Sequence, residues 1–172
     1  MYYAKSRSVK SPSKTNETDA GIDFYVPEFT KSFITDFVAK NPTIKISNNK
    51  IFLDPQQRIL IPSGIYVNLA KTKQELGWKG IMLVAHNKSG KATTKGLDRL
   101  AEVVDEQYMG EVHISVVNTS NHTIFIEEHE KLIQFCLEEV SYKKPIEMSM
   151  DELYSGFEST RGDNGFGHSD KL

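Results

Sequence analysis

The chain has 172 residues, 38% of them hydrophobic and 26% charged, with a formal net charge of −2 at pH 7. This composition is typical of one folded globular domain, and the small net charge excludes a global field that attracts DNA or anionic membranes. The single cysteine, Cys136, excludes an internal disulfide, and no apolar run approaches the ~18 residues of a membrane-spanning helix. Because the first ten residues lack the apolar core of a signal peptide, we expect no secretion, and a cytoplasmic location, or the host cytoplasm or nucleus if the protein is viral.

Short segments rich in β-branched and aromatic residues, separated by turn residues, predict a mostly β-stranded fold. In chain order, we expect strands at 21–27, 58–69, 80–86, 111–118, 123–127 and 131–140. In 111–118, Val112, Ile114 and Val116 alternate with His113 and Ser115, so the first three should be buried and His113 should face solvent. Many short strands at this spacing favour an antiparallel sandwich, barrel or jelly roll.

Two segments have a helical pattern instead. In 30–40, apolar pairs recur four residues apart and Asn41-Pro42 follows, which predicts a short amphipathic helix that ends there. In 149–156, Ser149 is a candidate N-cap, and Gly156 follows the last turn. We expect one domain over 1–140 and a C-terminal arm over 141–172. Cys136 lies in an apolar run and should be buried.

Charge is unevenly divided along the chain. Residues 71–99 hold seven basic and two acidic side chains, whereas 101–140 hold nine acidic side chains and one lysine. This division is typical of two solvated faces, and it also fits an anion site beside a reactive carboxylate. A phosphate-binding loop in "SGKATTKG" is excluded because its first glycine is absent and Ala92 follows the lysine. The five histidines lack zinc-site spacing, so we expect no zinc site.

Five stretches carry chemistry that turns alone do not explain. In "DAGIDFYVP", turn formation accounts for Asp19 but not for Asp23 within the strand. "NKSGKA" (87–92) is an ordinary turn or a nest of phosphate donors, and "LAEVVDEQYMGEV" (100–112) predicts a hairpin with Asp105 near its tip. Gln134 lies within an apolar strand, where a buried amide needs partners. The tail "RGDNGFGHSD" surrounds Phe166 with glycines, as in a frayed end or in a lid that becomes ordered over a ligand.

Taken in order, these stretches resemble the five motifs of the trimeric dUTPases. The motifs are "DAGIDF" (19–24), "NKSGKA" (87–92), "VVDEQYMGE" (103–111), "HEKLIQF" (129–135) and "RGDNGFGHS" (161–169). The resemblance spans nearly the whole chain except residues 28–57, which look like an insertion. It implies an all-β distorted jelly-roll subunit and a homotrimer with sites at subunit interfaces. It also implies Mg²⁺-dependent hydrolysis of dUTP to dUMP and pyrophosphate, which keeps uracil out of DNA and supplies dUMP for thymidylate synthesis, with no direct binding to nucleic acid.

The resemblance also implies roles for individual residues. Asp105 corresponds to the carboxylate that activates water, a general base one hydrogen bond from the nucleophile. The residues expected to bind substrate are Lys88, Ser89, Gly90, Arg99, Val103, Val104, Tyr108, Gln134, Arg161, Phe166 and Gly167. The resemblance implies that the triphosphate and water hold Mg²⁺ with no direct protein ligand, so Asp23 is expected to act through water molecules of the metal or by orienting Lys88. Backbone groups of 99–104 would read the uracil edge, Tyr108 would lie against the deoxyribose, and Phe166 would stack over the base.

The chain departs from the family pattern at several positions. Lys88 replaces an arginine and keeps the charge without the planar bidentate contact. Glu102 stands where glycine is usual, so its side chain must point outward or alter the pocket. Gln107 and His168 replace a common aspartate and serine. Two alternatives remain open: a dCTP deaminase-like enzyme, although Thr93 occupies the place of that family's arginine, and a nucleotide-sensing interaction protein that uses 28–57 as its partner surface.

Overall fold

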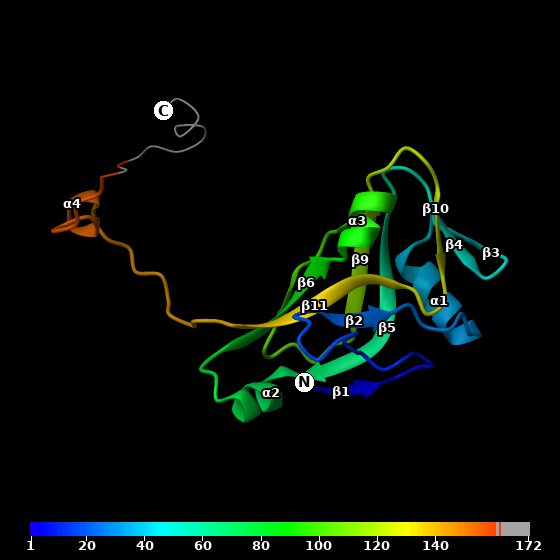
Figure 1. Ribbon diagram of the computed structural model, residues 1–172, viewed down its shortest axis with the longest axis horizontal. Helices are drawn as coiled ribbons and strands as arrows, with labels where there is room; N and C mark the ends of the chain where they lie inside the picture. The colour runs from blue at the N-terminus through cyan, green and yellow to red at the C-terminus, as the bar shows by residue number, and fades with distance from the viewer. Residues whose placement is uncertain (161, 163–172) are drawn as a thin grey trace. The chain divides into compact units, whose positions relative to one another are not determined.

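The computed structural model describes residues 1–160 and 162, and these form mainly antiparallel β-structure (Figure 1). The chain divides into two compact units, Met1–Ser141 and Tyr142–Leu172. The elements of the described residues are β1 (Tyr2–Lys5), β2 (Ile22–Tyr25), α1 (Lys31–Lys40), β3 (Lys45–Ser47), β4 (Lys50–Leu53), β5 (Arg58–Asn68), α2 (Leu69–Leu76), β6 (Ile81–Asn87), α3 (Ser89–Lys95), β7 (Leu97–Arg99), β8 (Val103–Asp105), β9 (Val112–Asn118), β10 (Ile124–Glu127), β11 (Lys131–Glu139) and α4 (Met150–Leu153).

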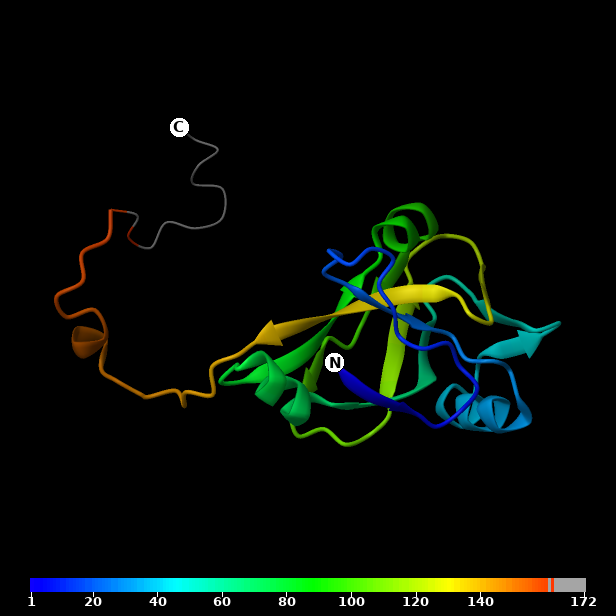
Figure 2. The same cartoon turned by 60° about the horizontal axis from the view of Figure 1, so that its bottom comes forward.

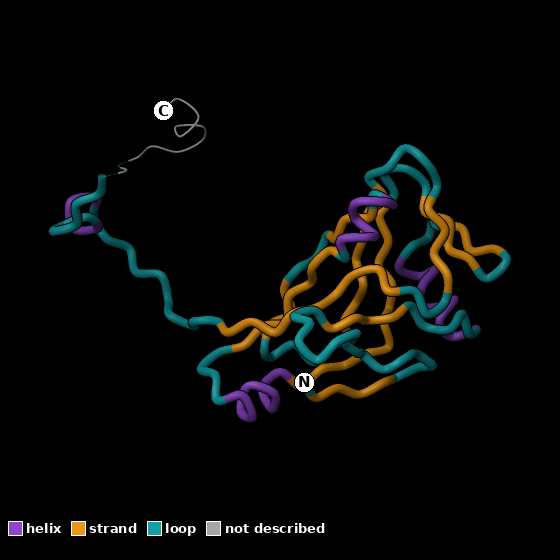
Figure 3. The backbone as a smooth tube through the Cα atoms, viewed as in Figure 1, coloured by secondary structure: helices purple, strands orange, loops and turns teal. Residues whose placement is uncertain are grey.

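Two four-stranded sheets make up most of the first unit. Their strand orders are β1-β5-β9-β7 and β2-β11-β6-β8, and the smaller sheet β10-β4-β3 adjoins them (Figure 3). Every pairing between these strands is antiparallel. The expected all-β class is confirmed, as are the strands expected at 21–27, 58–69, 80–86, 111–118, 123–127 and 131–140. Residues 28–57, expected to be an insertion, contain α1, β3 and β4.

The core is one apolar cluster to which both four-stranded sheets contribute. In β4 and β10, alternate residues are buried in this cluster, which is the consequence of the two-residue period of a β-strand. Phe24 in β2 and Phe135 in β11 are almost completely buried, and their ring centroids lie 4.5 Å apart. Burying one such side chain contributes about 1.5–3 kcal/mol. Val112, Ile114 and Val116 of β9 are buried as expected, and their aliphatic side chains join the same cluster.

Helix α1 forms where the sequence predicts it and packs against β5. The Thr30 hydroxyl accepts a hydrogen bond from Phe33 N at 3.3 Å, which caps the first turn. Phe33 and Phe37 are fully buried. At the other end, the amide of Asn41 bonds both N and O of Leu60, at 2.8 and 2.9 Å, and so ties the helix end to β5. Figures 1 and 2 show α1 and α2 near opposite ends of β5.

The Tyr142–Leu172 unit contains α4, and Ser149 caps it as expected. Ser149 and Glu152 exchange side chain-to-backbone hydrogen bonds, the reciprocal capping box. These bonds lower the pKa of the Glu152 carboxyl. No helix of the described residues is both long and apolar enough to cross a membrane.

Candidate active site

A buried carboxylate and two lysines meet where β2, β11 and β6 lie side by side. Asp23 in β2 is 3% exposed. Its Oδ1 lies 2.5 Å from Lys88 Nζ, and its Oδ2 lies 2.8 Å from Lys131 Nζ. A buried carboxylate needs such partners to remain charged. The hydrogen bond to Asp23 raises the pKa of the Lys131 ammonium, against the opposite effect of burial. Lys131 was not predicted from the sequence, although a charged residue opening an apolar strand was a usable signal.

Gln134 lies beside this centre, opposite both Asp23 in β2 and His86 in β6. Its Nε2 donates to Asn87 O at 3.1 Å, so the amide expected to need a partner has one. Gly21 makes room for the side chain, because a Cβ at Gly21 would lie 2.1 Å from Gln134 Oε1. A side chain at the glycine of "DAGIDF" would therefore displace Gln134 of the fourth motif.

The segment after β6 forms a helix, not the turn or nest expected for 87–92. Helix α3 starts directly after Lys88. Two threonine hydroxyls stabilise it by donating back to carbonyls one turn earlier, Thr93 to Ser89 O at 2.5 Å and Thr94 to Gly90 O. No periodic apolar pattern marks α3 in the sequence, because none of its side chains is buried. The N–H groups of its first turn have no partner within the helix, as at every helix start.

Two hollows adjoin these residues and share Lys88 and Gln134. The larger has a volume of about 660 Å³, and the smaller about 370 Å³. The larger is lined by Thr15, Asp19, Ala20, Gly21, Asp23, His86, Asn87, Lys88, Arg99, Gln134 and Cys136, and the smaller by Lys88, Ser89, Gly90, Lys91, Thr94, Lys95 and Gln134. Three lysines and no carboxylate line the smaller hollow, which makes it suited to an anion.

Cys136 and His113 are placed differently from the sequence expectations. Cys136 is half-buried and lines the larger hollow, because it lies on the outward face of β11. Burial nevertheless raises the pKa of its thiol. His113 is half-buried, and burial lowers its pKa. The prediction that His113 faces solvent was wrong, since its Nδ1 lies 2.8 Å from Glu111 O and its Nε2 is buried.

Asp105 and Tyr108 lie on a tight turn after β8. Tyr108 N donates to Asp105 O at 3.0 Å, and the Tyr108 phenol donates to Glu111 O at 3.0 Å. A cavity of about 190 Å³ adjoins the turn, lined by Ala101, Glu102, Val103, Val104, Asp105, Tyr108, Glu111, Val112, His113 and Phe135. The hairpin expected over 100–112 was wrong: β8 pairs with β6, whereas β9 pairs with β5 and β7 in the other sheet.

Arg99 and Glu102 form an ion pair beside this turn. Arg99 Nη2 lies 2.6 Å from Glu102 Oε1, and Arg99 Nε donates to Ala85 O at 2.8 Å. Glu102 O in turn accepts from Ala85 N at 2.7 Å. The Glu102 side chain therefore pairs with Arg99 and is half exposed, at a position where the family usually has glycine.

The two groups of predicted residues lie on separate parts of one chain. Asp105 is opposite Met82 in β6, whereas Lys88 follows the far end of that strand. At about 3.3 Å per residue, this places Asp105 about 20 Å from Lys88. One chain thus brings together Asp23, Lys88 and Gln134, with Ser89 and Gly90 next to them. It separately brings together Val103, Val104, Asp105 and Tyr108. Arg161, Phe166 and Gly167 lie outside the described residues.

The described residues lack the ligand set of a protein-bound metal. Among residues 1–160 and 162, no three His, Cys, Asp or Glu side chains are arranged to hold an ion. A hard cation such as Mg²⁺ commonly takes most of its ligands from substrate phosphates and water, with one or two carboxylates. Two carboxylates, those of Asp19 and Asp23, line the larger hollow.

The sequence of the chain is similar to the sequences of known dUTPases. The dUTPase family model matches residues 7–170. The deoxyuridine 5'-triphosphate nucleotidohydrolase of Fusobacterium nucleatum subsp. nucleatum is 33% identical over 123 residues, which are 70% of this chain and 75% of that protein. The enzyme of the same name from Candida albicans is 27% identical over 169 residues, covering 98% and 86% of the two chains.

Solved structures have the same fold. A mutant dUTPase of Staphylococcus bacteriophage 80alpha with dUpNHpp has a TM-score of 0.69 and 17% identity, covering 98% of this chain and 96% of that one. A dUTPase mutant from phage phi11 of S. aureus, described with a structural Mg(II) ion, has a TM-score of 0.63 and 16% identity, covering 87% and 97%. With a family model that matches residues 7–170, this chain belongs to the dUTPase family.

Proposed function

We propose that two surfaces of this dUTPase, contributed by different copies of the chain, form the site where dUTP is hydrolysed to dUMP and pyrophosphate. The observation that carries this proposal is the distance of about 20 Å between Asp105 and Lys88 along β6. A triphosphate held at Lys88 cannot present its α-phosphorus to Asp105 of the same chain. A homotrimer with three interface sites would bring the two residues together, because a cyclic assembly places the Asp105 surface of one copy against the Lys88 surface of its neighbour.

The lysine-rich surface is proposed to hold the triphosphate. Lys88, Ser89, Gln134 and the N–H of Gly90 would donate to phosphate oxygens. Asp23 keeps the Lys88 ammonium at 2.5 Å, which fixes its position and limits the conformations lost on binding. Mg²⁺ bound to the triphosphate would neutralise part of its charge, and Asp23 would reach that ion through water molecules.

The β8 surface is proposed to recognise the nucleoside. β8 is the edge strand of its sheet, and Glu102 O accepts from Ala85 N. Peptide groups alternate in direction along an antiparallel strand, so those of Val103 point to the open edge. The uracil edge, with its acceptor-donor-acceptor order, would pair with backbone groups of 99–104. Cytosine would leave buried groups unpaired, at about 1–3 kcal/mol each. Tyr108 would exclude a 2'-hydroxyl.

Asp105 is proposed as the general base. Its carboxylate would accept a proton from water while the water oxygen bonds to the α-phosphorus. The bond from that phosphorus to the bridging oxygen breaks, and pyrophosphate leaves with the electron pair. Charge builds on the phosphate oxygens during attack, so Lys88 and the backbone donors stabilise the transition state more than the ground state.

The arm over 141–172 is proposed to close the site. Arg161 would bind the terminal phosphate, Phe166 would stack on uracil, and Gly167 would let the backbone approach the substrate. Deleting residues 160–172 should leave a folded trimer with strongly reduced turnover. Near-normal turnover by this truncated chain, with its assembly confirmed by light scattering, would refute the lid.

Pyrophosphate release measured with dUTP, dCTP, dTTP and UTP tests the activity itself. We expect release from dUTP, and much less from the other three. Asp105→Asn should abolish turnover and keep nucleotide binding. Ammonia release from dCTP without pyrophosphate from dUTP would instead favour a deaminase, and binding of dUTP without turnover by the wild type would favour a nucleotide-sensing protein.

A further inference from the structure

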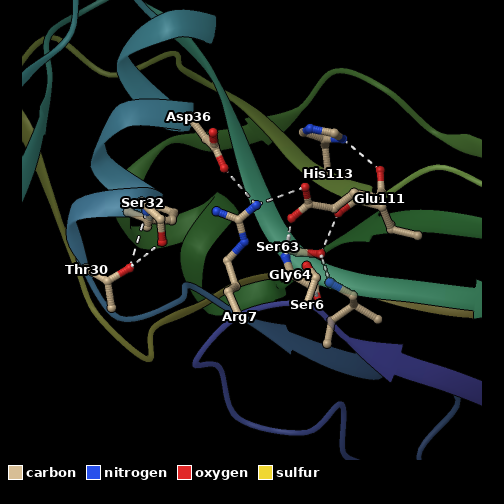
Figure 4. A network of polar contacts seen from close by, with 12 residues as sticks. Ser6, Arg7, Thr30, Ser32, Asp36, Ser63, Gly64, Glu111 and His113 are labelled. Carbon is tan, nitrogen blue, oxygen red and sulfur yellow. Dashed lines mark hydrogen bonds and ion pairs between the residues drawn. The ribbon is translucent and has the colours of Figure 1, made fainter.

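Glu111 is the last residue of the third motif (Figure 4). It connects the turn that carries Asp105 and Tyr108, called the substrate turn below, to the rest of the fold. Its carbonyl oxygen accepts from the Tyr108 phenol at 3.0 Å and lies 2.8 Å from His113 Nδ1. Its carboxylate accepts from Gly64 N at 2.5 Å and from Arg7 Nη2 at 3.1 Å. The Glu111 side chain is 11% exposed, so a change in either partner acts on a largely buried charge.

Gly64 presents its N–H to Glu111 because β5 is irregular at this point. The pairing of β5 with β9 shifts register between Pro62 and Ile65, and Gly64 has φ of +76°. A bulge of this kind removes a peptide group from the ladder. Here the carboxylate of Glu111 satisfies the N–H, and Ser6 N donates to the Gly64 carbonyl at 2.9 Å.

Arg7 supplies the positive charge opposite Glu111. Its guanidinium is held from three sides: Glu111 Oε2 at 3.1 Å, Asp36 Oδ2 of α1 at 3.2 Å, and the Phe33 ring, whose centroid lies 6.0 Å from Cζ. Gly64 packs directly on the same side chain, since a Cβ there would lie 2.4 Å from Arg7 Cγ. Figure 4 shows the Arg7 guanidinium between Asp36 of α1 and Glu111.

We infer that Arg7 and Glu111 are positioning residues that set the place of Tyr108 and thereby the discrimination between deoxyribose and ribose. The inference rests on the proposed nucleoside surface. The Tyr108 phenol is anchored on the Glu111 carbonyl, so its position follows that of Glu111. Arg7 and the Gly64 N–H fix Glu111 from the opposite side. Because Arg7 is also held by Asp36, the segment over 28–57 supports the same turn.

A purely structural role would lower the rates with dUTP and UTP together. A positioning role changes their ratio, because only UTP carries the 2'-hydroxyl that Tyr108 has to exclude. The decisive quantity is therefore kcat/KM for dUTP divided by kcat/KM for UTP, measured by pyrophosphate release with the full-length chain.

The test uses Glu111→Gln, Arg7→Met and Arg7→Lys, with Lys50→Met as the control. Glu111→Gln keeps an acceptor for the Gly64 N–H and removes the charge opposite Arg7. We expect this variant and Arg7→Met to lower the ratio about tenfold, the effect of one charge-assisted hydrogen bond. The ratio for Arg7→Lys should lie between those for Arg7→Met and the wild type, because lysine keeps the charge but lacks the planar guanidinium that bonds two partners at once. Lys50 pairs with Glu127 at 2.6 Å on an exposed surface, and Lys50→Met should leave the ratio unchanged.

Two outcomes would overturn the inference: an unchanged ratio in every folded Arg7 and Glu111 variant, or an equal fall in the control. If Glu111→Gln does not fold, the order wild type, Arg7→Lys, Arg7→Met decides alone. Failure of the proposed function gives a different result, namely a wild-type enzyme that shows no preference for dUTP.

Discussion

Mixing two inactive variants should restore activity if each site draws on two chains. The first variant is Asp105→Asn, a nearly isosteric change at an exposed side chain. The second is Lys88→Met, which removes one partner of Asp23 and leaves Lys131 Nζ at 2.8 Å. The buried carboxylate therefore keeps an opposite charge, and both variants should fold.

The size of the effect follows from the separation within one chain. Loss of a general base lowers the rate about 10²–10⁴-fold, so the assembly of Asp105→Asn chains should be nearly inactive. If each site takes Asp105 from one chain and Lys88 from its neighbour, random 1:1 assembly leaves about a quarter of the sites intact. A mixture should thus reach about a quarter of wild-type turnover per site, far above either parent.

The assay is pyrophosphate release after the two variants are unfolded together in urea, refolded and isolated as assembled protein. Each variant refolded alone, and the two mixed without unfolding, are the controls. Turnover that remains at the mean of the two parents, in protein shown by two affinity tags to contain both chains, would mean that a single chain forms the whole site.

Three further changes test the substrate turn, the buried histidine and the core. Gly110→Ala would place a Cβ 2.4 Å from the Tyr108 phenol oxygen, so kcat/KM for dUTP should fall about 2–10-fold with little change in Tm, and an unchanged value would exclude this contact as a constraint. Burial lowers the pKa of His113 below the ordinary 6.5, so stability is complete above that pH and declines as pH falls through the lowered value. The loss of Tm between about pH 7.5 and about pH 5.5 should be smaller in His113→Gln, and an equal loss would assign the pH dependence to other groups. Phe24→Ala should reduce the free energy of unfolding by about 3–5 kcal/mol in urea titrations at fixed protein concentration, and a loss below ~1 kcal/mol would contradict the packing of Phe24 against Phe135.

Local patterns were sufficient for the elements that bury one regular face. The strands at 58–69, 80–86 and 131–140 are rich in β-branched and aromatic residues, and the helix at 30–40 has the helical period, with Thr30 and Asn41-Pro42 at its ends. Helix α2 was missed although its signals were present. Asn68 accepts from Lys71 N at 2.8 Å as its cap, and Gly77 ends it with φ of +69°. The strand predicted over 58–69 includes only its first residue, Leu69, and no helix was predicted over 70–76 because β5 runs directly into α2.

The sequence by itself therefore determined the β-rich class, most strand positions and, through the order of five short motifs, the chemistry of the protein. Each of these depends on residues that are close together in the chain. The tertiary structure alone decided that β8 joins β6 and not β9, which separates Asp105 from Lys88, and that Arg7 meets Glu111 across 104 positions. Such pairings depend on which distant strand edges and charges are buried together. Their free energy is set by the packing of the whole chain and cannot be read from any single segment.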